Sequence, residues 1–233
     1  MTLEKILRPL LHLVYPNVCL TCQSLLQPDE TYICHECQNG FDTFLLPNES
    51  AHVMLASLNE LSPNQTVIDD ALSLYRFYKQ GNLQSLIHSI KYDGISQLAV
   101  EQGRRLGDAL RREKPHSTFD CIVPMPLHHI RKIERGYNQA ERLARGVSEV
   151  IGVPVKELVG RTRYTSTQTG FTLEGRKQNI KNAFECAVPL NGEHVLLIDD
   201  VFTTGSTLME CAKTLKRNRA GKITIATLAV TAS

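Results

Sequence analysis

The sequence predicts an α/β protein in which a mostly parallel sheet is flanked by helices, with a small module near its N-terminus. Short apolar runs, such as 195–198, are typical of buried strands, and they alternate with longer segments whose apolar residues recur at helical spacing. The 233 residues are 42% hydrophobic and 21% charged, which argues against a disordered, fibrous or coiled-coil protein. This length accommodates one large domain and a small additional module.

Apolar residues near the start of the chain predict a short amphipathic helix, because they recur at helical spacing: Leu3, Ile6, Leu7, Leu10, Leu11 and Val14. A secretory signal peptide is not indicated, since Glu4 lies where positive charge is expected and no small-residue cleavage site follows. The longest uncharged stretch, 9–28, contains Pro16 and several polar residues, so it is unsuited to span a membrane. We therefore expect a cytoplasmic protein without membrane insertion.

Four of the seven cysteines form two C-x2-C pairs with eleven residues between them: Cys19, Cys22, Cys34 and Cys37. Each pair can direct two thiolates at one point, and two pairs complete the tetrahedral sulfur site that Zn²⁺ prefers. Because all four positions are Cys, we expect closed, structural zinc in a zinc-ribbon-like module of residues 1–45, with a hairpin tip around Pro28. Disulfides, an iron–sulfur cluster and His35 as a substitute ligand are the alternatives.

The rest of the chain divides into expected strands and helices. We read 46–67 as a linker with one helix inside it, because Pro and Asn residues punctuate it. Strands are expected at 71–78, 121–123, 195–198 and 223–230, and helices at 83–90, 95–110, 140–151 and 206–218. Cys121, Cys186 and Cys211 lie in apolar contexts typical of core thiols. A parallel sheet of this kind binds ligands at the carboxyl ends of its strands.

Charge is concentrated in the middle of the chain. Residues 101–181 contain 16 Lys and Arg against 9 Asp and Glu, whereas the whole chain has a net charge of only +2. Such a basic region suits an anionic ligand such as phosphate or pyrophosphate, and less directly nucleic acid; a solvated basic face is the alternative. Aromatic residues make up 6% and Trp is absent, so no interleaved aromatic and basic pattern supports direct nucleic-acid binding.

The stretch 195–207, VLLIDDVFTTGST, carries the clearest chemical signal. Asp199 and Asp200 follow an apolar strand, and the next loop opens a helix with Thr203, Thr204, Gly205, Ser206 and Thr207. Backbone N–H groups at a helix start can hold an anion, and the hydroxyls add donors. Two carboxylates cannot hold the same phosphate, so they suit the hydroxyls of a phosphorylated sugar, or a metal. A Ser/Thr-capped helix without a ligand is the alternative.

This stretch resembles the phosphoribosyl-pyrophosphate motif of type I phosphoribosyltransferases. Three further segments narrow the resemblance to the ComF family, which includes ComFC-type and GntX-type proteins: 87–92, 123–144 and 161–184. The four-cysteine knuckle is also typical of that family. Tyr137 stands where the family often has Phe, and Thr167 where Pro is common.

The resemblance implies a phosphoribosyltransferase-like domain over 68–233 and a role for each matched segment. Asp199 and Asp200 are expected to contact the ribose hydroxyls, and 203–207 to hold the 5′-phosphate. Pro126, Leu127 and His128 would form the pyrophosphate loop, with Lys91 reaching the same group. A hood over 161–179 would supply cations that neutralise pyrophosphate, Arg161, Arg163 and Arg176, the last of which joins the aspartates as a catalytic candidate.

Two functions remain open from the sequence. The first is an Mg²⁺-dependent phosphoribosyltransferase whose acceptor cannot be identified, because nothing in the expected hood indicates a purine, a pyrimidine or an amine. The second is a non-catalytic module that senses phosphoribosyl pyrophosphate and engages single-stranded DNA or proteins of the competence machinery. Members of the family are associated with DNA uptake in natural competence or with gluconate use, and the resemblance does not choose between them.

Overall fold

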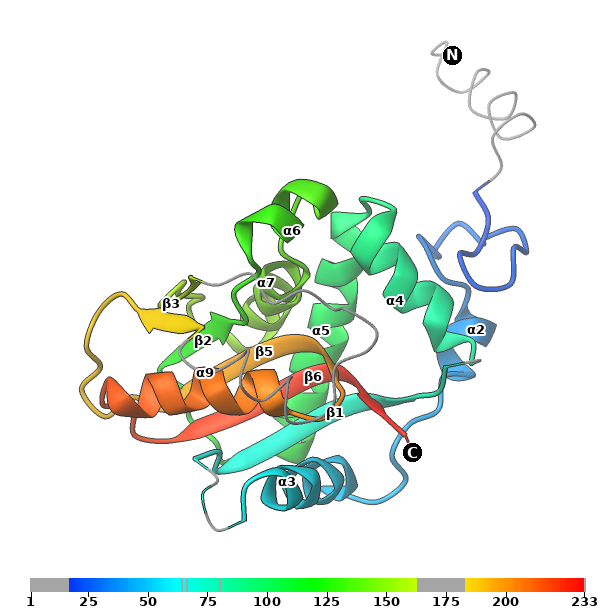
Figure 1. The fold of residues 1–233 in the computed structure, drawn as a ribbon. Helices are drawn as coiled ribbons and strands as arrows, with labels where there is room; N and C mark the ends of the chain where they lie inside the picture. The colour runs from blue at the N-terminus through cyan, green and yellow to red at the C-terminus, as the bar shows by residue number, and fades with distance from the viewer. Residues whose placement is uncertain (1–16, 64, 66, 80, 163–182, 233) are drawn as a thin grey trace.

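A four-stranded parallel sheet forms the centre of the molecule (Figure 1). The computed structural model describes residues 17–63, 65, 67–79, 81–162 and 183–232, so the expected N-terminal helix lies outside the described residues. The strand order is β1-β6-β5-β2, and every neighbouring pair is parallel. Their bounds are β1 (Asp70–Phe77), β2 (Cys121–Pro124), β5 (Val195–Phe202) and β6 (Ile223–Thr231). The parallel sheet flanked by helices confirms the predicted fold class.

Both faces of the sheet are buried under helices. On one face lie α3 (Glu49–Leu61) and α9 (Ser206–Arg217); Figure 1 shows α9 in front of the strands and α3 below β1. The other face carries α4 (Leu83–Tyr92), α5 (Ser96–Glu113) and α7 (Gln139–Ile151). Side chains alternate between the two cores, as when Leu197 packs with the first group of helices and Leu196 with the second. None of the helices in the described ranges combines the length and apolarity needed to cross a bilayer.

Helices α5 and α7 cross at very short range because glycines face each other at the contact. A Cβ atom added to Gly103 would lie 2.2 Å from the carbonyl oxygen of Leu143, and one added to Gly146 would lie 2.1 Å from that of Val100. Only glycine fits at both positions. This contact fixes α7, whose N-terminal end borders the candidate site.

The expected strands and helices are present, with small shifts at their ends. Strand β5 continues four residues beyond Ile198, because its pairing with β6 extends to Phe202 and Val230. Among the described residues, four short elements were not predicted: α2 (His35–Asn39), α6 (His129–Arg135), β3 (Val159–Arg161) and β4 (Phe184–Cys186). Helix α6 buries no residue, so it has no apolar face that a sequence pattern could show.

Helix α3 is the helix expected inside 46–67. Met54 and Leu58 on this helix are fully buried, and α3 packs against β1. The side chain of Ser50, near its start, accepts a 3.1 Å hydrogen bond from the backbone N–H of Ser73 in β1. This segment therefore contributes to the core of the sheet domain as well as connecting it to the cysteine pairs.

The N-terminal cysteine module (described residues 17–45) contains turns and one short helix, α2 (His35–Asn39). The expected hairpin tip is not formed as two paired strands; a single antiparallel bridge joins Val18 to Leu25. The module packs on the core through Phe41, whose ring meets that of Tyr75 edge-on at 5.3 Å between centroids. It is therefore continuous with the core that covers the α4–α5 face of the sheet.

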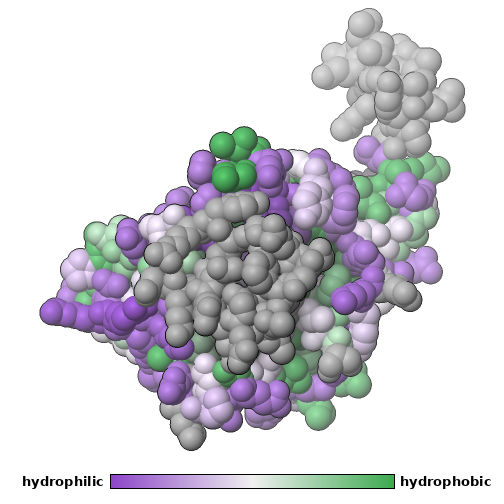
Figure 2. Space-filling model, in the orientation of Figure 1, coloured by the Kyte–Doolittle hydropathy of each residue, from purple (hydrophilic) through white to green (hydrophobic). Residues whose placement is uncertain are grey.

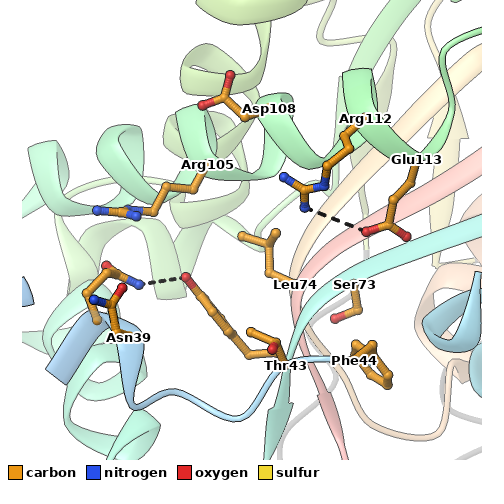
Figure 3. Close-up of a pocket in the computed structure, with 11 residues that line it drawn as sticks. Asn39, Thr43, Phe44, Ser73, Leu74, Arg105, Asp108, Arg112 and Glu113 are labelled. Atoms are coloured by element: carbon orange, nitrogen blue, oxygen red, sulfur yellow. Dashed lines mark hydrogen bonds and ion pairs between the residues drawn. The ribbon is translucent and has the colours of Figure 1, made fainter. Parts of the chain in front are cut away.

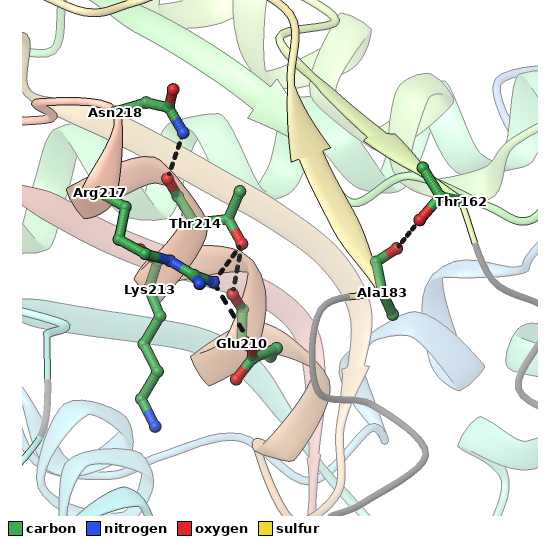
Figure 4. A network of polar contacts seen from close by, with 7 residues as sticks. All are labelled: Thr162, Ala183, Glu210, Lys213, Thr214, Arg217 and Asn218. Atoms are coloured by element: carbon green, nitrogen blue, oxygen red, sulfur yellow. Dashed lines mark hydrogen bonds and ion pairs between the residues drawn. The ribbon is translucent and has the colours of Figure 1, made fainter.

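Strands β3 and β4 pair antiparallel and form a small second sheet. Residues 162 and 183, which flank 163–182, are joined there, because the backbone N–H of Thr162 donates a 3.0 Å hydrogen bond to the carbonyl of Ala183. The hydroxyl of Thr162 donates to the same carbonyl at 3.4 Å (Figure 4). The same figure shows the C-terminal turns of α9, where Arg217 donates to the hydroxyl of Thr214 at 3.1 Å and Asn218 to its carbonyl at 2.9 Å. These bonds close the end of α9 that is remote from the candidate site.

Candidate functional site

The four paired cysteines come together in one cluster. Their sulfur atoms all lie within 4.8 Å of one another, and the Sγ atoms of Cys22 and Cys34 are 3.7 Å apart. Zinc–sulfur bonds of about 2.3 Å in a tetrahedron separate the sulfurs by about 3.8 Å, so these residues fit a zinc ion. Backbone N–H groups of Thr21 and Cys34 point at Cys19 Sγ, both at 3.4 Å. The cluster supports the expected structural metal site.

The structure bears on two of the three alternatives to a four-cysteine zinc site: a disulfide-bonded cluster, and His35 as a substitute ligand. All seven cysteines are free thiols, so the cluster is not disulfide-bonded. His35 lies outside the cluster, and its Nε2 atom is 2.9 Å from the carboxylate of Asp29. The Ser24 hydroxyl lies 2.9 Å from Cys22 Sγ, and hydrogen bonds from Ser24 lower the pKa of Cys22 to about 6. Burial, and next the hydrogen bonds of the other cluster thiols, raises the pKa of Cys37, so metal binding must displace a proton from this thiol.

A second centre lies at the carboxyl ends of β2 and β5. It is a cavity of about 150 Å³ lined by the loop after β2 and by residues of α4, α6, α7, β3, β5 and α9. Its lining residues are Lys91, Met125, Pro126, Leu127, Arg131, Arg135, Asn138, Gln139, Arg161, Asp199, Asp200 and Thr207. This is the position at which parallel α/β sheets bind ligands.

The two aspartates form a carboxylate pair in which Asp200 is buried and Asp199 is half-buried. Asp200 is 6% exposed, its Oδ1 accepts a 2.7 Å hydrogen bond from the N–H of Val201, and its Oδ2 lies 3.1 Å from Lys91 Nζ. Asp199 accepts a 2.8 Å hydrogen bond from the N–H of Asp200. Burial, and next the negative charge of Asp200, raises the pKa of Asp199 to about 7. One of the two carboxyls therefore changes charge near neutral pH.

Cations surround this pair. Lys91 is at the end of α4, Arg131 and Arg135 are four residues apart on α6, and Arg161 ends β3. Burial lowers the pKa of Arg161, whose guanidinium lies 5.6 Å from the ring centre of Phe184. Four cationic side chains against two carboxylates give the cavity a positive balance, which suits an anionic ligand.

A turn before α7 holds two walls of the cavity in place. The hydroxyl of Tyr137 donates to the carbonyl of Ile90, next to Lys91, and the side-chain amide of Asn138 donates to the carbonyl of Met125 at 3.0 Å. The Oδ1 atom of Asn138 also caps α7 by accepting from the N–H of Ala140. Next to it, Gln139 is 6% exposed, and its Oε1 atom has no hydrogen-bond partner within the described part of the chain. Gln139 thus offers an acceptor to a ligand.

The loop 203–207 passes into α9 with a glycine at its sharpest point. Gly205 has φ +73°, and a Cβ there would lie 2.5 Å from Leu58 on α3 and 2.7 Å from Phe202. Both the left-handed backbone and the close packing require glycine. The hydroxyls of Thr204 and Ser206 are 2.9 Å apart at the helix start. The first turn of α9 thus presents hydroxyl and backbone donors beside the carboxylate pair.

The structure brings together many of the residues that the sequence singled out. Those that line the cavity are Lys91, Pro126, Leu127, Arg161, Asp199, Asp200 and Thr207. The lining does not include 203–206, and His128 instead caps α6 by accepting from the N–H of Ile130 at 3.4 Å. Arg163 and Arg176 lie outside the described residues.

Sequence reasoning did not assign Met125, Arg131, Arg135, Asn138 and Gln139 to the site. The spacing of Arg131 and Arg135 could have suggested one helix face, but only if α6 had been recognised. The hydrogen bond from Asn138 to Met125 joins residues thirteen apart and leaves no signal in the sequence. Above the site, α6 exposes Ile133, and Figure 2 shows apolar surface over this helix.

The chain is similar to a family model, to curated proteins and to solved structures. A family model described as "Phosphoribosyl transferase domain" matches residues 134–233. The DNA utilization protein YhgH of Escherichia coli (strain K12) is 33% identical over 217 residues, covering 90% of this chain and 88% of its own. Competence protein F of Haemophilus influenzae is 44% identical over 102 residues, 42% of this chain and 44% of its own. Among solved structures, adenine phosphoribosyltransferase from Saccharomyces cerevisiae overlaps 59% of this chain and 69% of its own, at 15% identity and a TM-score of 0.37.

Proposed function

Because the chain belongs to the ComF family of competence and DNA-utilisation proteins, with a domain of the phosphoribosyltransferase type, we propose that it binds phosphoribosyl pyrophosphate with Mg²⁺ and transfers the phosphoribosyl group to an acceptor. One observation carries the proposal. Two adjacent carboxylates and four cationic side chains face the same cavity at the strand ends. A ligand with vicinal hydroxyls at one part and several phosphates at others matches that distribution of charge.

In the proposal, the two carboxylates bind the ribose of the ligand, and the loop after them binds its 5′-phosphate. Asp199 and Asp200 accept hydrogen bonds from the ribose 2′- and 3′-hydroxyls, since two carboxylates repel phosphate. The loop 203–207 holds the 5′-phosphate with backbone N–H groups and hydroxyls at the start of α9. Thr207, the loop residue that lines the cavity, marks where these two parts meet.

The remaining walls hold the pyrophosphate. In the proposal, Lys91, Arg131, Arg135 and Arg161 neutralise its charge, and the segment 126–128 turns its backbone toward it. Arg163 and Arg176 are proposed to add to these cations from the hood segment. The chemistry that Mg²⁺ supplies when bound is further neutralisation of the pyrophosphate, and the carboxylate oxygens of Asp199 and Asp200 are donors that suit this hard cation.

In the proposed reaction the bond from ribose C1 to the pyrophosphate oxygen breaks, and a bond from C1 to the acceptor atom forms. The pyrophosphate leaves with the bonding electrons, and the acceptor loses a proton if it carries one on that atom. The sugar passes through an oxocarbenium-like state, which the carboxylate pair beside the ribose stabilises.

A second candidate function is binding without transfer, in a competence factor that also engages single-stranded DNA or other proteins. The names of the relatives favour it, because they refer to competence and DNA utilisation. The structure adds one observation in its favour: no histidine is among the lining residues that it describes, and His128 is engaged as a helix cap. A dedicated base for the acceptor is therefore not evident in the described cavity.

Release of pyrophosphate separates the two candidates. Wild type is incubated with Mg²⁺, phosphoribosyl pyrophosphate and a panel of acceptors: purine and pyrimidine bases, amines and a single-stranded oligonucleotide. We expect pyrophosphate and a phosphoribosylated product with one acceptor, and neither from Asp199→Asn/Asp200→Asn. The matched control is Asp42→Asn, an exposed carboxylate remote from the cavity lining. Ligand binding without pyrophosphate release across the panel would instead support the second candidate.

A further inference from the structure

A larger cavity lies apart from the strand-end site, and no lining residue is common to the two. It measures about 440 Å³, opens to solvent, and is lined by α5, by β1 at the edge of the sheet, and by the segment 38–44 of the cysteine module (Figure 3). This volume is in the range that holds a small-molecule ligand. The proposed phosphoribosyl transfer uses none of these walls.

Gln38 and Tyr75, which line this cavity, form a closed hydrogen-bond network with Gln102. Tyr75 accepts a 2.7 Å hydrogen bond from the amide of Gln38, and Gln102 donates to Gln38 at 3.1 Å. The three side chains are buried, and the Tyr75 hydroxyl completes the ring by donating to Gln102 at 3.4 Å. A closed network of this kind holds its members in one arrangement. The network therefore fixes two of the side chains that line the cavity, Gln38 and Tyr75.

One face of α5 supplies charge at regular spacing. Arg105, Asp108 and Arg112 line the cavity, and the two arginines are seven residues apart, which is about 10 Å along a helix. Arg105 makes no ion pair with any other residue in the described ranges, whereas Arg112 pairs with Glu113 at 3.8 Å. Glu113 also lines the cavity, so its two arginines are accompanied by two carboxylates. Across from them lie the apolar side chains of Phe44 and Leu74.

We propose that this cavity binds a nucleoside 5′-monophosphate, with guanine as the preferred base. One arginine pairs with the phosphate, and the other donates to an acceptor edge such as O6 and N7 of guanine. Asp108, between them, accepts from the ribose hydroxyls, while Phe44 and Leu74 contact the base.

Calorimetric titration of GMP, AMP and UMP into the full, zinc-loaded chain tests this site. We expect GMP to bind most tightly, since adenine presents an amino group where guanine presents O6. The Arg105→Ala/Arg112→Ala variant should bind GMP at least about 100-fold more weakly, because two charge-assisted contacts are lost. The matched control is Arg104→Ala/Arg111→Ala, which removes the same charge from α5 at positions outside the cavity and should retain binding.

A nucleotide could also enter the strand-end site as a product, so Asp199→Asn/Asp200→Asn is titrated in parallel. Retained GMP binding in this variant, together with its loss in Arg105→Ala/Arg112→Ala, supports the proposal whether or not phosphoribosyl transfer occurs. The opposite pattern places the nucleotide at the strand ends and overturns it. Failure of wild type to bind any of the three nucleotides also overturns it, and equal binding of AMP and GMP contradicts the assigned base contact.

Discussion

The side-chain amide of Asn138 donates a 3.0 Å hydrogen bond to the backbone carbonyl of Met125 and so joins the start of α7 to the loop that follows β2. Met125 precedes the segment 126–128, to which we assign the pyrophosphate. The same side chain caps α7 through Oδ1, so one residue both starts a helix and positions a wall of the cavity. The geometry of the site thus depends on a residue that we do not expect to contact the sugar.

Asn138→Asp separates these two roles. The carboxylate keeps the oxygen that caps α7 but replaces the donor with an acceptor opposite the carbonyl of Met125. We expect a loss of about 1–3 kcal/mol in the free energy of unfolding and about tenfold weaker binding of phosphoribosyl pyrophosphate. Urea unfolding and calorimetry measure the two effects. Asn82→Asp is the control, since Asn82 begins α4 without a side-chain capping bond; wild-type binding by Asn138→Asp would contradict a positioning role.

The carboxylate pair should make stability depend on pH in an identifiable direction. The pKa of Asp199 is raised from 3.8 to about 7 in the folded protein. Between these values the folded chain holds a proton that the unfolded chain has released, so wild-type stability should fall as pH rises from about 4 to about 7.

Asp199→Asn removes this penalty. We expect its free energy of unfolding to exceed that of wild type by on the order of 2 kcal/mol at about pH 8, with little difference at about pH 4. Urea unfolding across this range is the measurement, and Asp42→Asn should differ from wild type by less than about 0.5 kcal/mol at both ends. A variant less stable than wild type at the alkaline end would refute the assignment.

Loss of the metal should destabilise the helices α4 and α5 as well as the cysteine module. Cys19 and Cys34 share an apolar core with Leu86 of α4 and Leu106 of α5, so their arrangement is coupled to the helices on that face. We expect Cys22→Ser to lower zinc content well below one ion per chain and to lower the unfolding midpoint in urea. His35→Ala should keep its zinc, because His35 bonds to Asp29 instead. Elemental analysis checks both, and zinc loss in His35→Ala would contradict the four-cysteine site.

The contact of α5 with α7 predicts a large effect from a single methyl group. Gly146→Ala places a Cβ 2.1 Å from the carbonyl oxygen of Val100, and the helices must separate to admit it. We expect a loss of about 2–4 kcal/mol in the free energy of unfolding, as for overpacked cores. Gly160→Ala, where the added Cβ meets nothing within 4 Å, should cost under about 1 kcal/mol. Similar values for the two variants in urea unfolding would argue against close helix contact.

The sequence predicts the fold well where physical constraints are local. The apolar run at 195–198 and the Ser/Thr-rich start of α9 indicate a strand followed by a helix, and both are present. Helix α6 escapes prediction because all of its side chains remain at least partly exposed.

The site was less predictable because its walls depend on tertiary contacts. Aspartates 199 and 200 follow from the strand before them, but the cations on α6 reach the cavity only through the path of the chain after β2. The bonds of Tyr137 and Asn138 to backbone carbonyls have no sequence signature, since every residue carries such a carbonyl.

The central claim is that the strand-end cavity binds phosphoribosyl pyrophosphate through its carboxylate pair. Calorimetric titration of this ligand with Mg²⁺ into wild type and into Asp199→Asn/Asp200→Asn tests it most directly. We predict saturable binding by wild type and none by the double variant, with both proteins folded and loaded with zinc. Equal binding by both, or no binding by wild type, would contradict the claim and would indicate that the fold here serves protein or DNA partners instead.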